Sequence, residues 1–170
     1  MSIINPHREN PKQALLEIQE LSSLTLKFRK AVENSQTDKY LINDCNFRDF
    51  PYGCCGDASD LLAEFLMSEY HIPTLYVCGY YYYTDLTALP QSHAWLKQKD
   101  IIIDITGDQF RDRSEFFNYN SPVYVGKLDA MHELFVVKQR NIRIAGLTAR
   151  NNDYRMKMLY KTILSHIVEG

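Results

Sequence analysis

Apolar side chains recur at helical spacing in three parts of the chain. Their spacing predicts helices over residues 11–34, 55–70 and 151–168. The middle helix shows the pattern most clearly, because its apolar positions form one stripe: Ala58, Leu61, Leu62, Phe65 and Leu66. Residues 35–49 are mostly polar, which predicts a loop that leads into a turn at residues 50–53.

A different pattern fills the centre of the chain, where β-branched and aromatic residues are concentrated. It predicts strands over residues 74–83, 92–98, 101–106, 123–128 and 134–138. Helices therefore come first, strands follow close together, and a helix comes last. This order predicts an α+β fold in which N-terminal helices pack on a mainly antiparallel sheet.

Length and composition restrict the class of protein. A chain of 170 residues suits one domain. We expect this domain to span residues 1–170, with a helical N-terminal part at 1–49, a core at 50–140 and a C-terminal helix within 141–170. The net charge is −2, which implies no strongly charged polymer as partner. No apolar run is long enough to cross a membrane, and we expect no membrane partner.

The four cysteines are few for a chain of this length, which argues against a disulfide-stapled secreted protein and fits a reducing compartment. The polar, proline-containing start of the chain does not resemble a secretory signal. We therefore expect a cytoplasmic location. Export remains an alternative, because a signal that had been removed would leave no trace in the sequence.

The segment Gly53-Cys54-Cys55-Gly56-Asp57 places two cysteines where a turn runs into a helix. The unpaired N–H groups and the dipole at the start of a helix stabilise a thiolate and lower the pKa of a cysteine. The same N–H groups can donate to an oxyanion that forms during attack on a carbonyl. Both cysteines fall on the apolar stripe of the helix, so periodicity does not select between them.

A thiolate nucleophile also needs a base and a group that orients the base. One predicted hairpin carries both, with His93 in its first strand and Asp104 in its second. A two-residue loop at Gln98 and Lys99 would place His93 directly opposite Asp104, with the two Cβ atoms ~5 Å apart. Moving the loop by one residue would make them diagonal neighbours on the same face, whereas a three-residue loop would separate them.

These residues also carry a family resemblance. Gly53-Cys54-Cys55 with Ser59 and Leu61, then His93-Ala94-Trp95, then Asp104-Ile105-Thr106 resemble the motifs of the transglutaminase-like branch of the papain-like cysteine enzymes. The resemblance covers about residues 50–110. It implies a papain-like or transglutaminase-like core, in which a helix that carries the cysteine packs on a sheet that carries the histidine and the aspartate. Its Gly-x-Cys register selects Cys55 as the nucleophile, with Cys54 as a neighbour near the helix cap and Trp95 as a supporting residue.

The chain departs from the wider papain-like pattern at one position. A glutamine six residues before the cysteine often completes the oxyanion hole, and this chain has Asp49 there. The second oxyanion donor is therefore open between Asn46, Gln109 and a backbone N–H group. Gln109 is kept as a supporting residue, and Asp108 is the alternative orienter if the hairpin register differs.

The sequence thus predicts a catalytic triad of Cys55, His93 and Asp104 that acts on amide bonds through a thioester. Its substrate would be a peptide, a protein or a small amide, and the outcome would be hydrolysis, deamidation or transamidation. The alternative is a papain-like fold kept as a non-catalytic binding or regulatory module. The oligomeric state is left open.

Metal, cofactor and nucleic-acid binding have weaker support. Cys54 and Cys55 with His71, His93 or His132 lack the paired Cys-x-x-Cys spacing of zinc sites. We therefore expect no metal. We also find no glycine-rich phosphate loop, and we expect no cofactor. Residues 127–161 hold eight basic and three acidic side chains, a bias that would suit nucleic acid. A solvated helix face is the simpler interpretation.

Overall fold

The computed structural model describes residues 11–151 and 153–167. The α-helices among these residues are α1 (Pro11–Asn34), α2 (Lys39–Ile42), α3 (Cys55–Tyr70), α4 (Ala130–Glu133) and α5 (Tyr154–Leu164). The predictions of α1 and α3 are therefore confirmed. The predicted closing helix is confirmed over Tyr154–Leu164, while residues 152 and 168 lie outside the described residues.

The strands form one five-stranded sheet, which confirms the α+β class. They are β1 (Leu75–Tyr81), β2 (Gln91–Gln98), β3 (Ile101–Asp104), β4 (Tyr124–Gly126) and β5 (Val136–Ile144). Their order in the sheet is β4-β3-β2-β1-β5, and every neighbouring pair is antiparallel. Each strand that the sequence predicts is present, but β5 extends six residues beyond the predicted end at residue 138.

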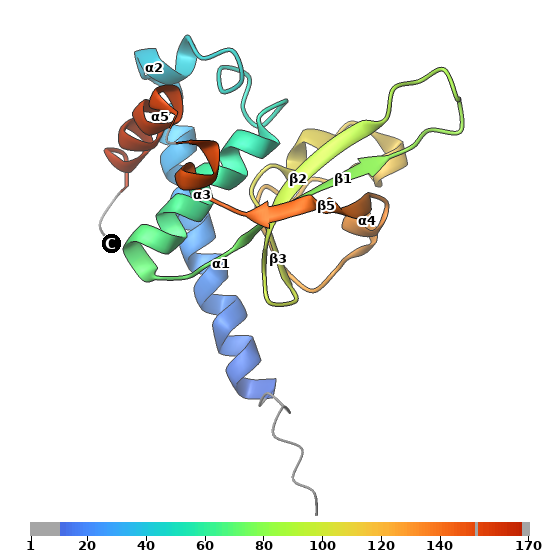
Figure 1. The fold of residues 1–170 in the computed structure, drawn as a ribbon, viewed down its shortest axis with the longest axis horizontal. Coiled ribbons are helices and arrows are strands. Elements are labelled where there is room, and N and C mark those ends of the chain that lie inside the picture. The colour runs from blue at the N-terminus through green and yellow to red at the C-terminus, as the bar shows by residue number, and fades with distance from the viewer. Residues whose placement is uncertain (1–10, 152, 168–170) are drawn as a thin grey trace, which may run out of the picture.

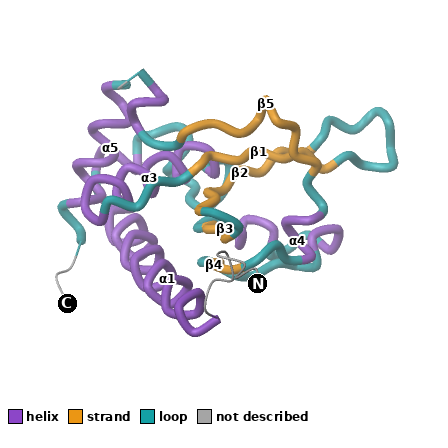
Figure 2. Tube along the Cα trace, turned by 60° about the horizontal axis from the view of Figure 1, so that its bottom comes forward, coloured by secondary structure: helices purple, strands orange, loops and turns teal. Residues whose placement is uncertain are grey.

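Two apolar clusters cover the two faces of the sheet. On one face, α1, α3 and α5 pack against Leu96 of β2 and Ile103 of β3. The other face holds an aromatic cluster built around Trp95, Phe110 and Phe135. Figures 1 and 2 show the three long helices together on one side of the molecule, with α4 well away from them. Alternation along β2 therefore sends Leu96 into the helical layer and His93 into the aromatic layer.

The register of the central hairpin differs from our first expectation. Gln98 pairs with Ile101, so the two-residue turn is Lys99-Asp100 rather than Gln98-Lys99. Lys99 takes a positive φ of 54° in this turn. The shift makes His93 and Asp104 diagonal neighbours on one face, which is the arrangement expected if the loop moved by one residue.

Two other differences between the predicted and the observed elements lie in polar segments of the chain. Residues 35–49 were predicted as a loop, but they include α2, which begins after Asp38, whose side chain accepts a hydrogen bond from the Tyr40 N–H group. One helical turn is too short to show a periodicity. The extra length of β5 was missed because most of its side chains are exposed, which leaves no alternation of apolar and polar positions.

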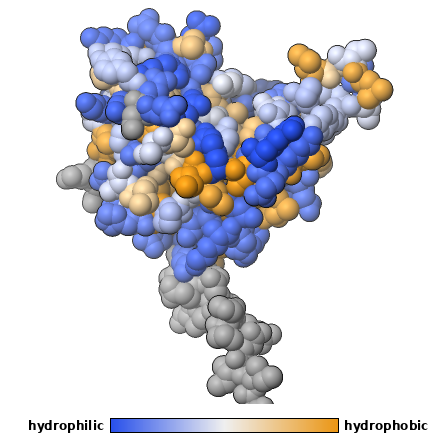
Figure 3. All heavy atoms as spheres, in the orientation of Figure 1, coloured by the Kyte–Doolittle hydropathy of each residue, from blue (hydrophilic) through white to orange (hydrophobic). Residues whose placement is uncertain are grey.

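Much of the surface visible in Figure 3 is hydrophilic, and hydrophobic groups lie on the β1–β2 connection that projects from the body. Leu86 and Leu89 in this connection are 97% and 86% exposed. Among the described residues, no helix combines the length and the apolar character needed to cross a membrane.

The basic bias of the C-terminal third is partly balanced within the fold. Several of its cations pair with acidic groups from earlier in the chain: Lys127 with Asp100, Arg143 with Asp60, Arg150 with Asp57, and Arg155 with Asp44 and Asp57. The first pair reaches the β2–β3 turn, and the others link the C-terminal segments to α3 and to the loop before it. The charge bias therefore has a structural use.

Candidate active site

Cys55 is the first residue of α3 and lies where the preceding turn meets the helix. Gly53 takes a φ of +69°, a conformation that glycine adopts without a steric penalty. Cys54 follows as the N-cap, and its carbonyl oxygen accepts the first helical hydrogen bond from the Ala58 N–H group at 2.8 Å. The Cys55 thiol therefore lies at the positive end of the α3 dipole, as the sequence predicts.

The two adjacent cysteines lie in different environments. Cys54 is buried in the helical layer, and its Sγ atom contacts the Pro51 carbonyl oxygen at 3.4 Å. Burial raises the pKa of Cys54 far above that of a free thiol, which keeps it protonated. Cys55 is partly exposed. Burial raises the pKa of Cys55, but the hydrogen bond and positive charge of His93, with the Ala94 N–H group, lower it overall.

His93 and Asp104 form a buried pair in the aromatic layer. The Nε2 atom of His93 lies 2.8 Å from Oδ2 of Asp104, and both side chains are almost inaccessible to solvent. Burial lowers the pKa of His93, yet the charge and hydrogen bond of Asp104, with the contribution of Cys55, raise it to about 10. Asp104 therefore holds the imidazole through Nε2, and Nδ1 is left for other contacts.

Asp104 remains ionised although it is buried. Its Oδ1 atom accepts hydrogen bonds from the Thr106 N–H group at 2.9 Å and the Thr106 hydroxyl at 3.2 Å. Burial raises the pKa of Asp104, but His93 and His132 lower it well below its usual range. Gly107 leaves room for this arrangement, because a Cβ there would lie 2.9 Å from Oδ2 of Asp104.

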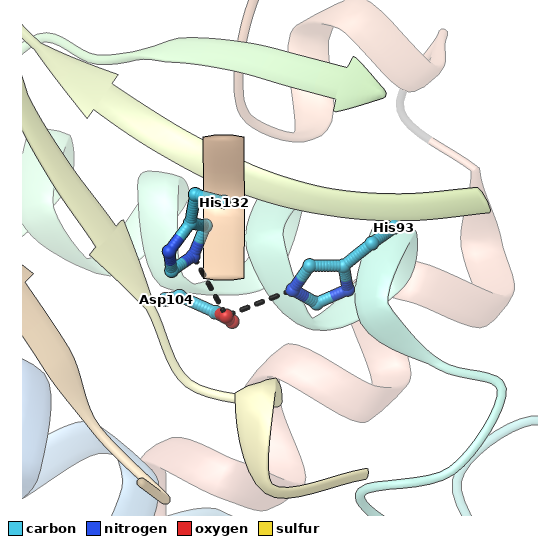
Figure 4. Close-up of side chains that lie close together, drawn as sticks. All are labelled: His93, Asp104 and His132. Carbon is cyan, nitrogen blue, oxygen red and sulfur yellow. Dashed lines mark hydrogen bonds and ion pairs between the residues drawn. The ribbon is translucent and has the colours of Figure 1, made fainter. Parts of the chain in front are cut away.

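His132 is a member of this cluster that the sequence did not place there. Its Nε2 atom lies 3.2 Å from Oδ2 of Asp104, and its Nδ1 atom lies 2.6 Å from Oδ1 of Asp129. Figure 4 shows both imidazole rings directed at the Asp104 carboxylate. Burial lowers the pKa of His132, but the hydrogen bonds to the two aspartates raise it overall. Because both ring nitrogens face carboxylate oxygens, His132 is held as an imidazolium.

The sequence contained one signal for this second histidine. Asp129 is the N-cap of α4, its carboxylate accepts from the His132 N–H group at 2.9 Å, and its other oxygen accepts from the Tyr119 hydroxyl at 2.9 Å. An Asp-x-x-His spacing allows such a cap, but it does not show that α4 packs close enough for His132 to contact Asp104. Sequence spacing alone offers His132 only as a possible metal ligand.

Gln109 lies against His93, in the short 3₁₀ turn Gly107–Phe110. Its Nε2 atom donates to the Thr106 carbonyl oxygen at 2.9 Å and lies 3.1 Å from Nδ1 of His93. A donor at Nδ1 stabilises the neutral imidazole, whose proton then lies on Nε2 facing Asp104. Gln109 therefore favours neutral His93, whereas Asp104 favours the imidazolium.

The other candidate residues from the sequence have separate partners. Asp108, the alternative orienter, forms a buried two-pronged ion pair with Arg29, with both N–O distances at 3.0 Å. Asn46 donates to Asp57 at 2.9 Å, and Asp49 pairs with Arg48 at the surface. Trp95 packs edge-on against His132, with ring centroids 5.1 Å apart, and so covers the cluster.

His93, Asp104 and His132 also offer potential metal-ligand atoms within 4.8 Å of one another. Hydrogen bonds already use these atoms. Both Nε2 atoms face the same oxygen of Asp104, so each carries a proton that it donates to this oxygen. A protonated nitrogen has no lone pair for a metal. This pattern favours a proton-sharing cluster over a metal centre.

The contact at Nδ1 leads to a prediction. Replacing Gln109 with alanine should raise the pKa of His93 by about half a unit to one unit, because one hydrogen bond of ~1 kcal/mol to the neutral ring is lost. NMR titration of the His93 ring protons measures this shift. Gln109→Glu should raise the pKa further, because a carboxylate accepts from the imidazolium. A fall in the pKa of His93 in both variants would contradict the assigned role of Gln109.

We compared the chain with protein-family models, with curated proteins and with solved structures, and found no match. The family resemblance therefore depends on the motif residues and on the environment that the fold gives them.

Proposed function

We propose that the chain is a cysteine acyl-transfer enzyme of transglutaminase-like type, with Cys55 as nucleophile, His93 as base and acid, and Asp104 as orienter. One observation carries the proposal. Cys55, a partly exposed residue at the start of a helix, has its thiol hydrogen-bonded to a buried histidine whose Nε2 atom is bound to a buried aspartate. This arrangement lowers the pKa of Cys55 while the adjacent Cys54 stays protonated. A merely structural cysteine does not need such an environment.

The proposed reaction has two steps. The Cys55 thiolate attacks the amide carbon, and the carbonyl electron pair moves to oxygen, facing N–H groups at the start of α3. The intermediate then collapses, the C–N bond breaks, and His93 gives its proton to the leaving amine. In the second step His93 takes a proton from water or from an amine, which attacks the thioester and releases the thiolate. Asp104 holds the tautomer throughout.

Asp104 and Gln109 stabilise the two protonation states of His93 that this cycle uses. Asp104 stabilises the imidazolium that exists while Cys55 is a thiolate, whereas Gln109 stabilises the neutral ring that remains after the proton has gone to the leaving group. We infer a reducing, cytoplasmic location, because the nucleophile works only as a free thiol and all four cysteines are free in the structure.

The reactivity of Cys55 tests the proposal. With limiting iodoacetamide, we expect Cys55 to be labelled selectively below pH 7, and we expect this labelling to be lost in His93→Ala. Peptide mapping by mass spectrometry identifies the labelled thiol, and exposed Cys45 in the same chain is the internal reference. Slow labelling with a midpoint near the free-thiol value of ~8.5 would leave a non-catalytic binding module as the better interpretation.

A further inference from the structure

A small hollow lies on the face of the sheet opposite His93, with one wall near the start of α3. Its volume is about 260 Å³, and it is lined by Tyr76, Cys78, Tyr80, Arg140, Asn141 and Arg143. The first three are alternate residues of β1 and so share one face. The Tyr76 hydroxyl lies 3.1 Å from the position that a Cβ on Gly56 would occupy, one residue after Cys55. One wall of the hollow is therefore close to the start of α3, the helix that carries Cys55.

An irregularity in β5 gives the hollow its polar wall. Val77 pairs with Ile142, and Gly79 pairs with Val137. The stretch of β5 between these two pairs is therefore longer than the matching stretch of β1. The additional residues bulge out of the ladder and include Arg140 and Asn141. Bulges commonly redirect side chains next to functional sites. Arg140 and Asn141 of this bulge both line the hollow.

The positive charge of the hollow comes from Arg140. Arg143 is already neutralised, because it donates to both oxygens of buried Asp60 at 2.9 and 2.7 Å and stacks on the Tyr76 ring. Arg140 is exposed, and within the described part of the chain it pairs with no acid. One uncompensated cation therefore faces the hollow.

Asn141 supplies an acceptor that lacks a partner. Its Oδ1 atom is buried and has no hydrogen-bond partner among the described residues. A buried acceptor left unpaired costs about 1–3 kcal/mol, and a turn of the Asn141 side chain towards the hollow would let a ligand N–H group recover that free energy. Tyr76 and Tyr80 add neutral hydroxyl groups, since burial of Tyr76 and the nearby Cys78 sulfur at Tyr80 raise their pKa values.

We propose that this hollow is a substrate subsite for an acidic residue of a peptide, with its carboxylate towards Arg140 and a backbone N–H group towards Oδ1 of Asn141. The inference rests on the proposed function of Cys55. It defines the substrate class of that site as peptides with a carboxylate side chain close to the reacting amide.

Two matched alkylating probes test the subsite. N-iodoacetyl-glutamate α-amide and N-iodoacetyl-glutamine α-amide have the same shape and differ by one negative charge. Each forms a C–S bond with Cys55 and releases iodide. We expect the glutamate probe to label Cys55 about fivefold faster than the glutamine probe at low salt, the scale of a single screened charge pair. The ratio should fall to about one in Arg140→Gln and below one in Arg140→Glu.

The control is Lys138→Gln, which removes an exposed charge from the same strand outside the hollow and should keep both the probe ratio and the iodoacetamide rate. Equal rates for the two probes in the native protein, or the same ratio in Arg140→Gln, would overturn the subsite. Failure of the proposed function is seen separately, because plain iodoacetamide would then label Cys55 no faster than Cys45. Thermal melting confirms that each variant is folded.

Discussion

Asp104→Asn is expected to lower the pKa of His93 by more than three units and to destabilise the fold by about 3–5 kcal/mol. In the native protein Asp104 and Cys55 hold the pKa of this buried imidazole at about 10 against the effect of burial. Asparagine removes the negative charge, so burial then favours the neutral ring. His132 also loses one of its two carboxylate partners, which leaves a buried cation poorly compensated.

The consequence for Cys55 follows from its partner. Without an imidazolium beside it the thiol regains a higher pKa, so alkylation at pH 6 should slow by about tenfold or more. This figure includes the greater nucleophilicity of the more basic thiolate. NMR titration of His93, iodoacetamide rates against pH and urea unfolding measure the three effects.

Asp108→Asn is the matched control for this variant. It removes a buried carboxylate four residues further on, and Asp108 serves Arg29 rather than the histidine. It should destabilise the fold while leaving the pKa of His93 and the alkylation profile of Cys55 near their native values. If Asp108→Asn rather than Asp104→Asn shifted the titration of His93, the assignment of the orienter would be wrong.

The parts of the site that sequence can predict are those governed by short-range geometry. A Gly-Cys turn before an apolar stripe predicts a cysteine at a helix start, and the alternation within one hairpin places His93 and Asp104 on one face. The exact turn was wrong because Lys99 accepts a positive φ and moves the loop by one residue. Moving a two-residue loop by one residue changes the pairing by two positions. Side chains alternate between faces with a period of two, so His93 and Asp104 still share a face.

The parts that sequence missed depend on contacts between distant segments. His132 reaches Asp104 from α4, and Arg29 reaches Asp108 from α1, across 28 and 79 residues respectively. No local periodicity signals either contact. Arg140 and Asn141 face the hollow only because β5 bulges against β1, and an exposed polar edge strand carries little pattern in its sequence. Tertiary packing decides these positions.

The pH dependence of stability offers a test of the Cys55–His93 pair that needs no substrate. The pKa of Cys55 is lowered by folding, so its contribution is present above the unfolded value of ~8.5 and is lost as the pH falls. The pKa of His93 is raised, so its contribution is present below ~6.5 and is lost as the pH rises through about 10. Between pH 6.5 and 8.5 the folded pair holds one proton on His93, and the unfolded chain holds one on the thiol.

The pair therefore makes the free energy of unfolding neither rise nor fall with pH within this window. Removing the thiol should introduce a pH dependence. In Cys55→Ala only the loss from His93 remains, so the free energy of unfolding should fall relative to the native protein by up to about 1.4 kcal/mol per pH unit. Urea unfolding at pH 6.5, 7.5 and 8.5 measures the difference, and the contribution of His132 is common to both chains.

Cys54→Ala separates this linkage from the cost of a cavity. Cys54 is buried and protonated in the folded protein, as a free thiol is in the unfolded chain over most of this window. Its loss should lower stability by a nearly constant amount from pH 6.5 to 8.5. If the curves for the native protein and Cys55→Ala also ran parallel, Cys55 would be a thiol in the folded state. A resting pair of thiolate Cys55 and imidazolium His93 would then be excluded, because such a pair must appear in the pH dependence of folding.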